Sequence, residues 1–328
     1  MIGAEWKKLL RQRWLIGIAI LLIFVDVGLF LNTQYTEKKD RVAAVPLFAK
    51  YQKETADMTN EQAQEYLTDQ LNTLSNFQFV QIALNGEVDE GLIKGLAEEN
   101  PNILEEYQQA GYEEDPLALM TKIQVISELL GQYQNVSGYQ AYLESIQTQY
   151  EQMKDSSFYE GRPYAEAQGK KTTEDFAKLQ GTEPEIGMNW GVEALMEEQI
   201  SSEILILLAL GICIVLVSQD RTHDLFGLLR SCRRGHGCLI AAKFAIALTA
   251  VLFLGISVYG SQIAIAWKLY GMGNLNRPMQ SVNELNESAR QLTVGGYLLD
   301  YYLRHLIAVL VLTAFMLCLF LSIYSTMT

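Results

Sequence analysis

The sequence predicts an all-α membrane protein with four transmembrane helices, because its apolar and charged residues are strongly segregated. Of its 328 residues, 49% are hydrophobic and 19% are charged, and these averages would suit a soluble protein. The apolar residues are concentrated in four runs, at 16–31, 204–217, 244–267 and 306–323. The last three runs contain no charged residue, and the first contains only Asp26. About 20 mostly apolar helical residues cross a bilayer core, so each run predicts a span.

With their flanking residues, the predicted spans are 15–32, 200–218, 243–267 and 303–325. The second run is short, and it reaches spanning length only when the residues on either side are included. The first run follows four basic residues, as the apolar region of a signal peptide does. It is longer than such a region, and no small-residue cleavage site follows it. We therefore expect a retained membrane anchor.

Basic residues close to the spans predict the orientation of the chain, because cytoplasmic segments are enriched in Lys and Arg. Residues 1–14 contain four basic residues and one acidic residue. The loop 219–242, together with Lys243, contains five basic residues and two acidic ones. Residues 33–199 instead contain 12 basic and 30 acidic residues. The N-terminus, the loop 219–242 and the end at 326–328 are expected in the cytoplasm, and the segments 33–199 and 268–302 outside.

Residues 1–14 predict an amphipathic helix that lies in the inner membrane interface. Trp6, Leu9, Leu10 and Trp14 recur at helical spacing, and four cations lie between them. Tryptophan favours the depth of the lipid headgroups, and cations favour lipid phosphate. The simpler alternative is a basic flank of the first span with no interfacial role.

The segment 33–199 predicts a mainly helical extracellular domain. Thr59 before Glu61 and Gln62 is typical of a helix start. Asp115 followed by Pro116 predicts a second start, because proline is favoured at the first helical position. Periodicity, or its absence, further predicts a helix at 137–150, a long loop at 169–187 and a short surface helix at 282–292.

Motifs of several enzyme classes are missing from the sequence. There is no Gly-rich phosphate loop ending in Lys-Ser/Thr, no Gly-x-Ser-x-Gly turn and no His-Glu-x-x-His helix. Only three histidines are present. We therefore expect neither ATP binding by that route nor a catalytic site of the soluble type, and we interpret the scattered carboxylates of 33–199 as a solvated surface.

Cysteine and histidine in the loop 219–242 raise the question of a metal site. Cys232, His236 and Cys238 lie close together, and His223 precedes them. Their spacing matches no familiar zinc motif, and the neighbouring arginines would repel a cation. We therefore expect no metal and no cofactor on this chain.

Asp26 is the one charged residue predicted within the apolar part of a span. A carboxylate at that depth is costly and often functional, so Asp26 is a candidate intramembrane polar site. Two structural alternatives remain. The side chain reaches the outer headgroup layer, or it pairs with a cation such as Arg304.

The loop between the second and third spans has the features of a docking segment. Residues 224–230 fit two helical turns along the inner surface, with an apolar face. Gly227 allows close approach of another backbone, and the arginines suit lipid phosphate or acidic residues of a partner. The alternative is a basic loop of no special role. The predicted docking residues are Asp224, Leu225, Phe226, Gly227, Leu228, Leu229, Arg230, Arg233 and Arg234.

This loop resembles the intracellular loop of permease subunits of type-2 ABC exporters, in a branch found in Gram-positive bacteria. Those loops contain an acidic residue, a glycine, a Leu-Leu pair, a turn with arginine and a lysine that opens the next span. The chain departs from the pattern at the turn, where many members have proline before the arginine. The order of interfacial helix, span, exterior domain, span and loop also fits. The corresponding residues here are Asp224, Gly227, Leu228, Leu229, Ser231 to Gly235, and Lys243.

Members of that family usually have six or more spans, so further spans are expected beyond Thr328 or on another chain. The resemblance implies that 224–230 forms a coupling helix seated on a separate ABC ATPase subunit, which holds ATP and Mg²⁺. It also implies a second permease chain, in a homo- or heterodimer, and contact with lipids of the bacterial plasma membrane. The implied activity is outward transport of a peptide or of an amphipathic, lipid-like substrate.

No enzymatic activity and no nucleic-acid partner are expected for this chain. The alternative function is a membrane-anchored sensor or scaffold whose extracellular helical domain binds a ligand or a partner protein. An intramembrane enzyme is a third hypothesis. It would need polar residues that face one another within the spans, where only Asp26 stands out.

Overall fold

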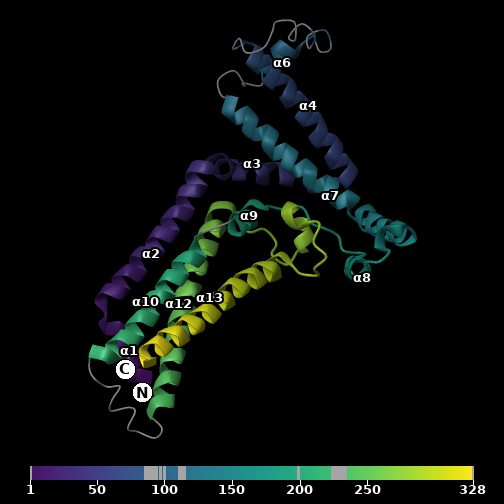
Figure 1. Cartoon of the computed structure of the whole chain (residues 1–328). Helices are drawn as coiled ribbons and strands as arrows, with labels where there is room; N and C mark the ends of the chain where they lie inside the picture. The colour runs from purple at the N-terminus through teal and green to yellow at the C-terminus, as the bar shows by residue number, and fades with distance from the viewer. Residues whose placement is uncertain are drawn as a thin grey trace. The chain divides into compact units, whose positions relative to one another are not determined.

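The computed structural model describes residues 2–84, 101–109, 116–197, 200–222 and 235–326, and the single positions Gly95 and Glu98. Among these residues the chain is helical and contains no β-strand (Figure 1). Four of the described helices are long and apolar enough to cross a membrane. The predicted all-α class is therefore confirmed for the described residues, with four helices that are candidate membrane spans.

The chain separates into two compact units. The span unit comprises Met1–Glu37, Ala194–Leu269 and Leu298–Thr328. The helical unit comprises Lys38–Glu193 and Tyr270–Tyr297. The second part of the helical unit comes from the segment that joins the third and fourth spans, which the sequence did not associate with the domain at 33–199.

The helices of the span unit agree with the predicted apolar runs. A short helix at the N-terminus precedes the first span, and a π-helical turn, η1 (Thr33–Glu37), extends that span. The spanning stretches are Arg13–Glu37, Ser201–Ser218, Gly237–Tyr270 and Val294–Ile323. The helices are α1 (Ile2–Arg11), α2 (Arg13–Asn32), α10 (Ser201–Thr222), α12 (Gly235–Tyr270) and α13 (Val294–Thr326).

Helix α10 is the most enclosed of the four spans. Within the protein, 56% of its spanning stretch is buried, compared with 44% for α12 and 17% for each of α2 and α13. Its buried residues include Leu205, Ala209 and Ile212, and they pack with residues of α12 such as Ile246 and Val251. Helices α2 and α13 therefore leave most of their apolar surface for lipid or for other chains.

A glycine permits the close approach of α12 and α13. A Cβ atom added at Gly255 would lie only 2.5 Å from Cδ1 of Leu306. Small residues commonly allow such close packing between membrane helices, because dispersion contacts there replace the hydrophobic effect.

The longest described helix of the helical unit is α7 (Pro116–Asp155). Thr59 caps the start of α4 (Asn60–Leu84), because the Gln62 amide nitrogen donates to Thr59 Oγ1 at 3.3 Å and the Thr59 amide donates to Gln62 Oε1 at 3.1 Å. This reciprocal cap confirms the predicted helix start. The helices are α3 (Lys39–Thr55), α4 (Asn60–Leu84), α6 (Ile103–Gln109), α7 (Pro116–Asp155), α8 (Pro163–Ala177) and the first part of α9 (Trp190–Met196), and the 3₁₀ turn η2 (Ser157–Tyr159) follows α7.

Helix α7 merges two predicted elements, because the start at Pro116 and the helix expected at 137–150 belong to one 40-residue helix. The prediction of a loop over 169–187 was wrong in its first half, which α8 occupies. Helix α8 is held by tertiary packing. Phe176 at its end packs with Leu143 of α7 in a small buried cluster, which a periodicity search within 169–187 does not detect.

The segment 270–297 forms an irregular layer of the helical unit rather than the expected helix at 282–292. It contains two single 3₁₀ turns, η3 (Met279–Ser281) and η4 (Asn283–Leu285). Arg277 holds this layer, because its Nη2 donates to Met188 O at 2.9 Å and to Asn189 Oδ1 at 2.8 Å. These side-chain contacts join residues nearly 90 positions apart, so no local sequence pattern predicts them.

Candidate functional site

The predicted docking residues Asp224–Arg230, Arg233 and Arg234 lie outside the described residues, as do His223 and Cys232. The structure describes the two helices that the loop connects. Helix α10 leads into it and ends at Thr222, and α12 follows it and begins at Gly235. Among the described residues, no group of three or more His, Cys, Asp or Glu side chains is arranged to hold a metal ion.

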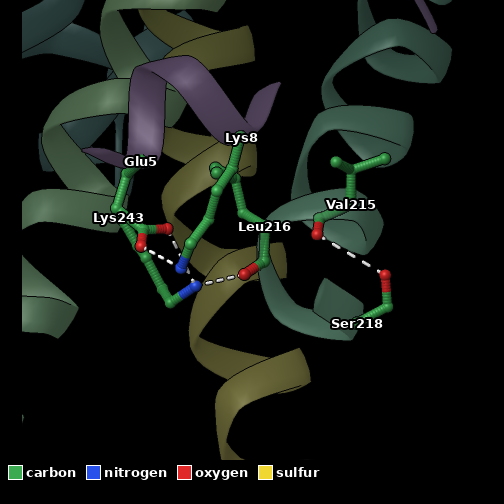
Figure 2. A network of polar contacts seen from close by, with 6 residues as sticks. All are labelled: Glu5, Lys8, Val215, Leu216, Ser218 and Lys243. Carbon is green, nitrogen blue, oxygen red and sulfur yellow. Dashed lines mark hydrogen bonds and ion pairs between the residues drawn. The ribbon is translucent and has the colours of Figure 1, made fainter. Parts of the chain in front are cut away.

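Lys243 ties the two flanking helices to the N-terminal helix (Figure 2). Its Nζ donates to Glu5 Oε2 of α1 at 3.4 Å and to the backbone carbonyl oxygen of Leu216 in α10. Lys8, one turn after Glu5, donates to the other carboxylate oxygen, Glu5 Oε1. Lys243 itself belongs to α12, so one ammonium group links three helices.

Both members of this ion pair are buried. Lys243 is 1% exposed and Glu5 is 3% exposed. A charge removed from water needs a partner of opposite sign or a full set of hydrogen bonds, and each of these residues supplies that for the other. In the sequence, Lys243 counted as one of the basic residues near the spans and as the lysine that opens the next span, and Glu5 counted only as a charge. A lone lysine at the start of an apolar run was the one available signal.

A second polar cluster surrounds Asp26. Ser201 Oγ of α10 donates to Asp26 Oδ1 at 2.7 Å, and Gln262 Nε2 of α12 donates to Asp26 Oδ2 at 3.0 Å. The same Nε2 also donates to Ser201 Oγ. All three side chains are at most 2% exposed. The spans thus bring together three polar residues that the sequence places 175 and 236 positions apart.

The suggested pairing of Asp26 with Arg304 is wrong. Arg304 Nε donates to Asp300 Oδ1 at 2.9 Å, one turn earlier on α13. Snorkelling of Asp26 to the headgroup layer is also wrong, because its carboxylate is buried against α10 and α12. Ser201 and Gln262 were missed because uncharged polar residues within apolar runs are common and carry little sequence signal.

Asp26 and Gln262 line a cavity of about 200 Å³ in the span unit. The cavity lies at the end of α2 that continues into η1, next to the start of α10. Glu197 contributes a second carboxylate to it, and none of its described lining residues is basic. The remaining lining residues are Leu29, Phe30, Thr33, Gln34, Ala194 and Ile200.

A separate cavity of about 310 Å³ is almost entirely apolar. It is bordered by α1, α2, α10 and α12, and it shares no lining residue with the Asp26 cavity. Its lining residues include Trp6, Leu9, Ile23, Leu208 and Phe253. Such a surface suits an acyl chain or another aliphatic group.

Comparison of the chain with protein-family models, with curated proteins and with solved structures finds no match.

Proposed function

We propose that this chain is a membrane permease subunit of an ATP-driven ABC exporter and that ATP is hydrolysed on a separate subunit. The observation that carries the proposal is the basic loop 219–242, which joins two candidate spans and has the Asp-x-x-Gly-Leu-Leu-Arg pattern. The segment Asp224–Arg230 docks on the ATPase, with Gly227, Leu228 and Leu229 as its main contact. A second permease chain completes the path.

The Lys243 cluster supports this role mechanically. A push on the loop reaches the end of α10 and the start of α12, which are the two helices that Lys243 connects. Through Glu5, the same displacement reaches α1. Nucleotide binding on the partner would therefore bias two arrangements of these helices as a group.

The proposed topology places the N-terminus and the loop 219–242 in the cytoplasm of a bacterial cell and the helical unit outside. It rests on the excess of basic residues in the short segments. In α1, Leu9 is buried, while Leu10 and Lys7 are exposed. That distribution supports an interfacial helix with one side against the spans and the other toward lipid headgroups.

The proposed substrate is an amphipathic or lipid-like molecule or a peptide. The apolar cavity bordered by Trp6, Ile23 and Phe253 supports the apolar part of that assignment, because it offers almost no polar surface. The large exposed apolar faces of α2 and α13 support a partner permease chain or lipid beside these helices.

The decisive experiment replaces the docking leucines and measures association with the ATPase. The double substitution Leu228→Asp and Leu229→Asp should abolish co-purification of a protein with a phosphate-binding loop, while the chain remains in the membrane. The matched control Cys238→Ser, in the same region but outside the contact residues, should retain it. If the double variant still co-purifies the ATPase at the wild-type level, the proposed docking role of Leu228 and Leu229 is wrong.

The second candidate function is a membrane-anchored sensor or scaffold. It is favoured by the helical unit, which is a compact body with its own buried cluster around Tyr139, Leu143, Phe176 and Leu179. This function requires no ATPase partner. Purification of the wild-type chain without any such protein, together with a ligand bound by the helical unit, would favour it.

A further inference from the structure

We propose that the Asp26 cavity is a binding site for a small organic cation, with a primary ammonium group held at Asp26 and Gln262 and a short aliphatic part against the apolar wall. This site goes beyond the proposed transport function. Binding there needs neither the ATPase nor the loop 219–242, because the lining residues belong to α2, η1, α9 and α12, together with Glu197 and Ile200.

The charge of the cavity selects a cation. Asp26 and Glu197 are both carboxylic acids, and the nine lining residues include no Lys, Arg or His. Ser201 and Gln262 each donate to one oxygen of Asp26, so they fix the orientation of the carboxylate without neutralising it. A carboxylate accepts about four hydrogen bonds in total, so Asp26 keeps acceptor capacity for a ligand.

Gln262 has a buried acceptor atom that lacks a hydrogen-bond donor among the described residues, which is a second and independent indication of a ligand. Its Nε2 is committed to Asp26 and Ser201. Its Oε1 is buried and has no hydrogen-bond partner among the described residues. Because Nε2 must face the carboxylate, Oε1 is the acceptor that the cluster leaves open. Buried polar atoms in native proteins normally have a partner, and an ammonium group donates three hydrogen bonds.

The size and walls of the cavity favour an organic cation over a bare ion. Its volume of about 200 Å³ is several times the roughly 30 Å³ that one water molecule occupies in the liquid. Leu29, Phe30 and Ile200 provide apolar wall for an alkyl group. An aromatic ring such as that of Phe30 also attracts ammonium groups. The chemistry therefore fits an alkylammonium of a few carbons.

The test is calorimetric titration of the full chain in phosphatidylcholine nanodiscs at constant sodium chloride, with n-butylammonium as the probe. Butyramide is the uncharged comparison of similar size. We expect saturable binding of butylammonium, and binding of butyramide weaker by about tenfold or more, since charge-assisted hydrogen bonds are about twice as strong as neutral ones.

Three variants assign the site. Asp26→Asn should weaken butylammonium binding by about tenfold or more, and Glu197→Gln should weaken it severalfold. Glu203→Gln is the matched control, because Glu203 is an exposed carboxylate of α10 that does not line the cavity. It should bind as the wild type does. If Asp26→Asn does not yield folded protein, the comparison of Glu197→Gln with Glu203→Gln decides.

Each of three results would overturn the proposal. Equal binding of butyramide and butylammonium would show that the positive charge of the ligand does not contribute to binding. Failure of butylammonium to bind, with sodium bound instead, would indicate a bare-ion site. Unchanged binding in Asp26→Asn or Glu197→Gln would place the ligand elsewhere. All three readouts use the isolated chain, so they are independent of whether Leu228 and Leu229 dock an ATPase.

Discussion

Glu5 of α1 and Lys243 of α12 form a buried ion pair, with 3.4 Å between Oε2 and Nζ, although 238 positions separate them in the sequence. The pair closes the same polar cluster that holds the Leu216 carbonyl of α10. Through this ion pair, α1 packs as part of the span unit and is more than a basic segment that precedes the first span.

Removing one partner of this pair should destabilise the span unit. In Glu5→Ala, Lys243 keeps its positive charge in a buried position, so we expect a loss of about 3 kcal/mol in the free energy of unfolding. Unfolding in detergent, followed by circular dichroism during SDS titration, measures this loss. Lys7→Ala is the control, because Lys7 is exposed on the same helix.

The double variant Glu5→Leu with Lys243→Leu should regain much of that stability, because replacing both members of a buried pair by apolar residues removes the uncompensated charge. If Glu5→Ala behaves like Lys7→Ala, the pair does not contribute to the stability of the span unit.

Gly255→Val should disrupt the packing of α12 against α13. The added side chain meets Leu306 Cδ1, and overpacking of this kind costs about 1–3 kcal/mol. Thermal unfolding of the purified chain measures the effect. Gly260→Val on the same helix is the control, since no atom lies within 4 Å of a Cβ added there.

A second substitution tests the mechanism. Leu306→Ala in the Gly255→Val background should restore part of the unfolding temperature, because it removes the atom that clashes. An additive loss in the double variant would contradict the predicted contact between these two positions.

The stability of the helical unit should fall as pH rises from about 4.5 to about 7. Burial and the nearby carboxylate of Glu284 raise the pKa of Glu193 to about 7, against the opposing effect of Arg41, whose Nη1 lies 2.9 Å from Glu193 Oε2. The fold therefore favours the protonated acid. Its stabilising contribution is complete below the unfolded pKa and is lost as pH passes the folded pKa.

Thermal unfolding as a function of pH tests this expectation, and the loss attributable to Glu193 amounts to at most about 3 kcal/mol. Glu193→Gln should flatten the profile between these pH values, because a glutamine does not titrate. Glu61→Gln, at an exposed position of α4, should leave the profile unchanged. The same slope in wild type and Glu193→Gln would assign the pH dependence to other groups.

Thiol labelling tests the orientation of the spans. In a chain with Cys238 as its single cysteine, an impermeant maleimide should not react on intact cells, but it should react in inside-out vesicles. Cys238 is exposed near the start of α12, so accessibility on the protein itself does not limit the reaction. A chain whose only cysteine is Ser156→Cys, at an exposed position of the helical unit, should show the opposite pattern. Rapid labelling of Cys238 on intact cells would reverse the topology.

Local patterns were sufficient for the spans and for the helix start at Thr59. An apolar run of spanning length and a reciprocal cap over four residues are complete within a short stretch of sequence, so their physics can be evaluated there. The same local view failed at 169–187, where α8 depends on contact between Phe176 and the distant helix α7. It also did not associate 270–297 with the helical unit.

The sequence by itself determined that the chain has four apolar helices and which residues interrupt them. Only the tertiary structure decided what those interruptions do. Asp26 meets Ser201 and Gln262 rather than Arg304, and Lys243 meets Glu5. The physical reason is that a buried polar group must find a partner, while the choice among distant partners depends on how the helices pack.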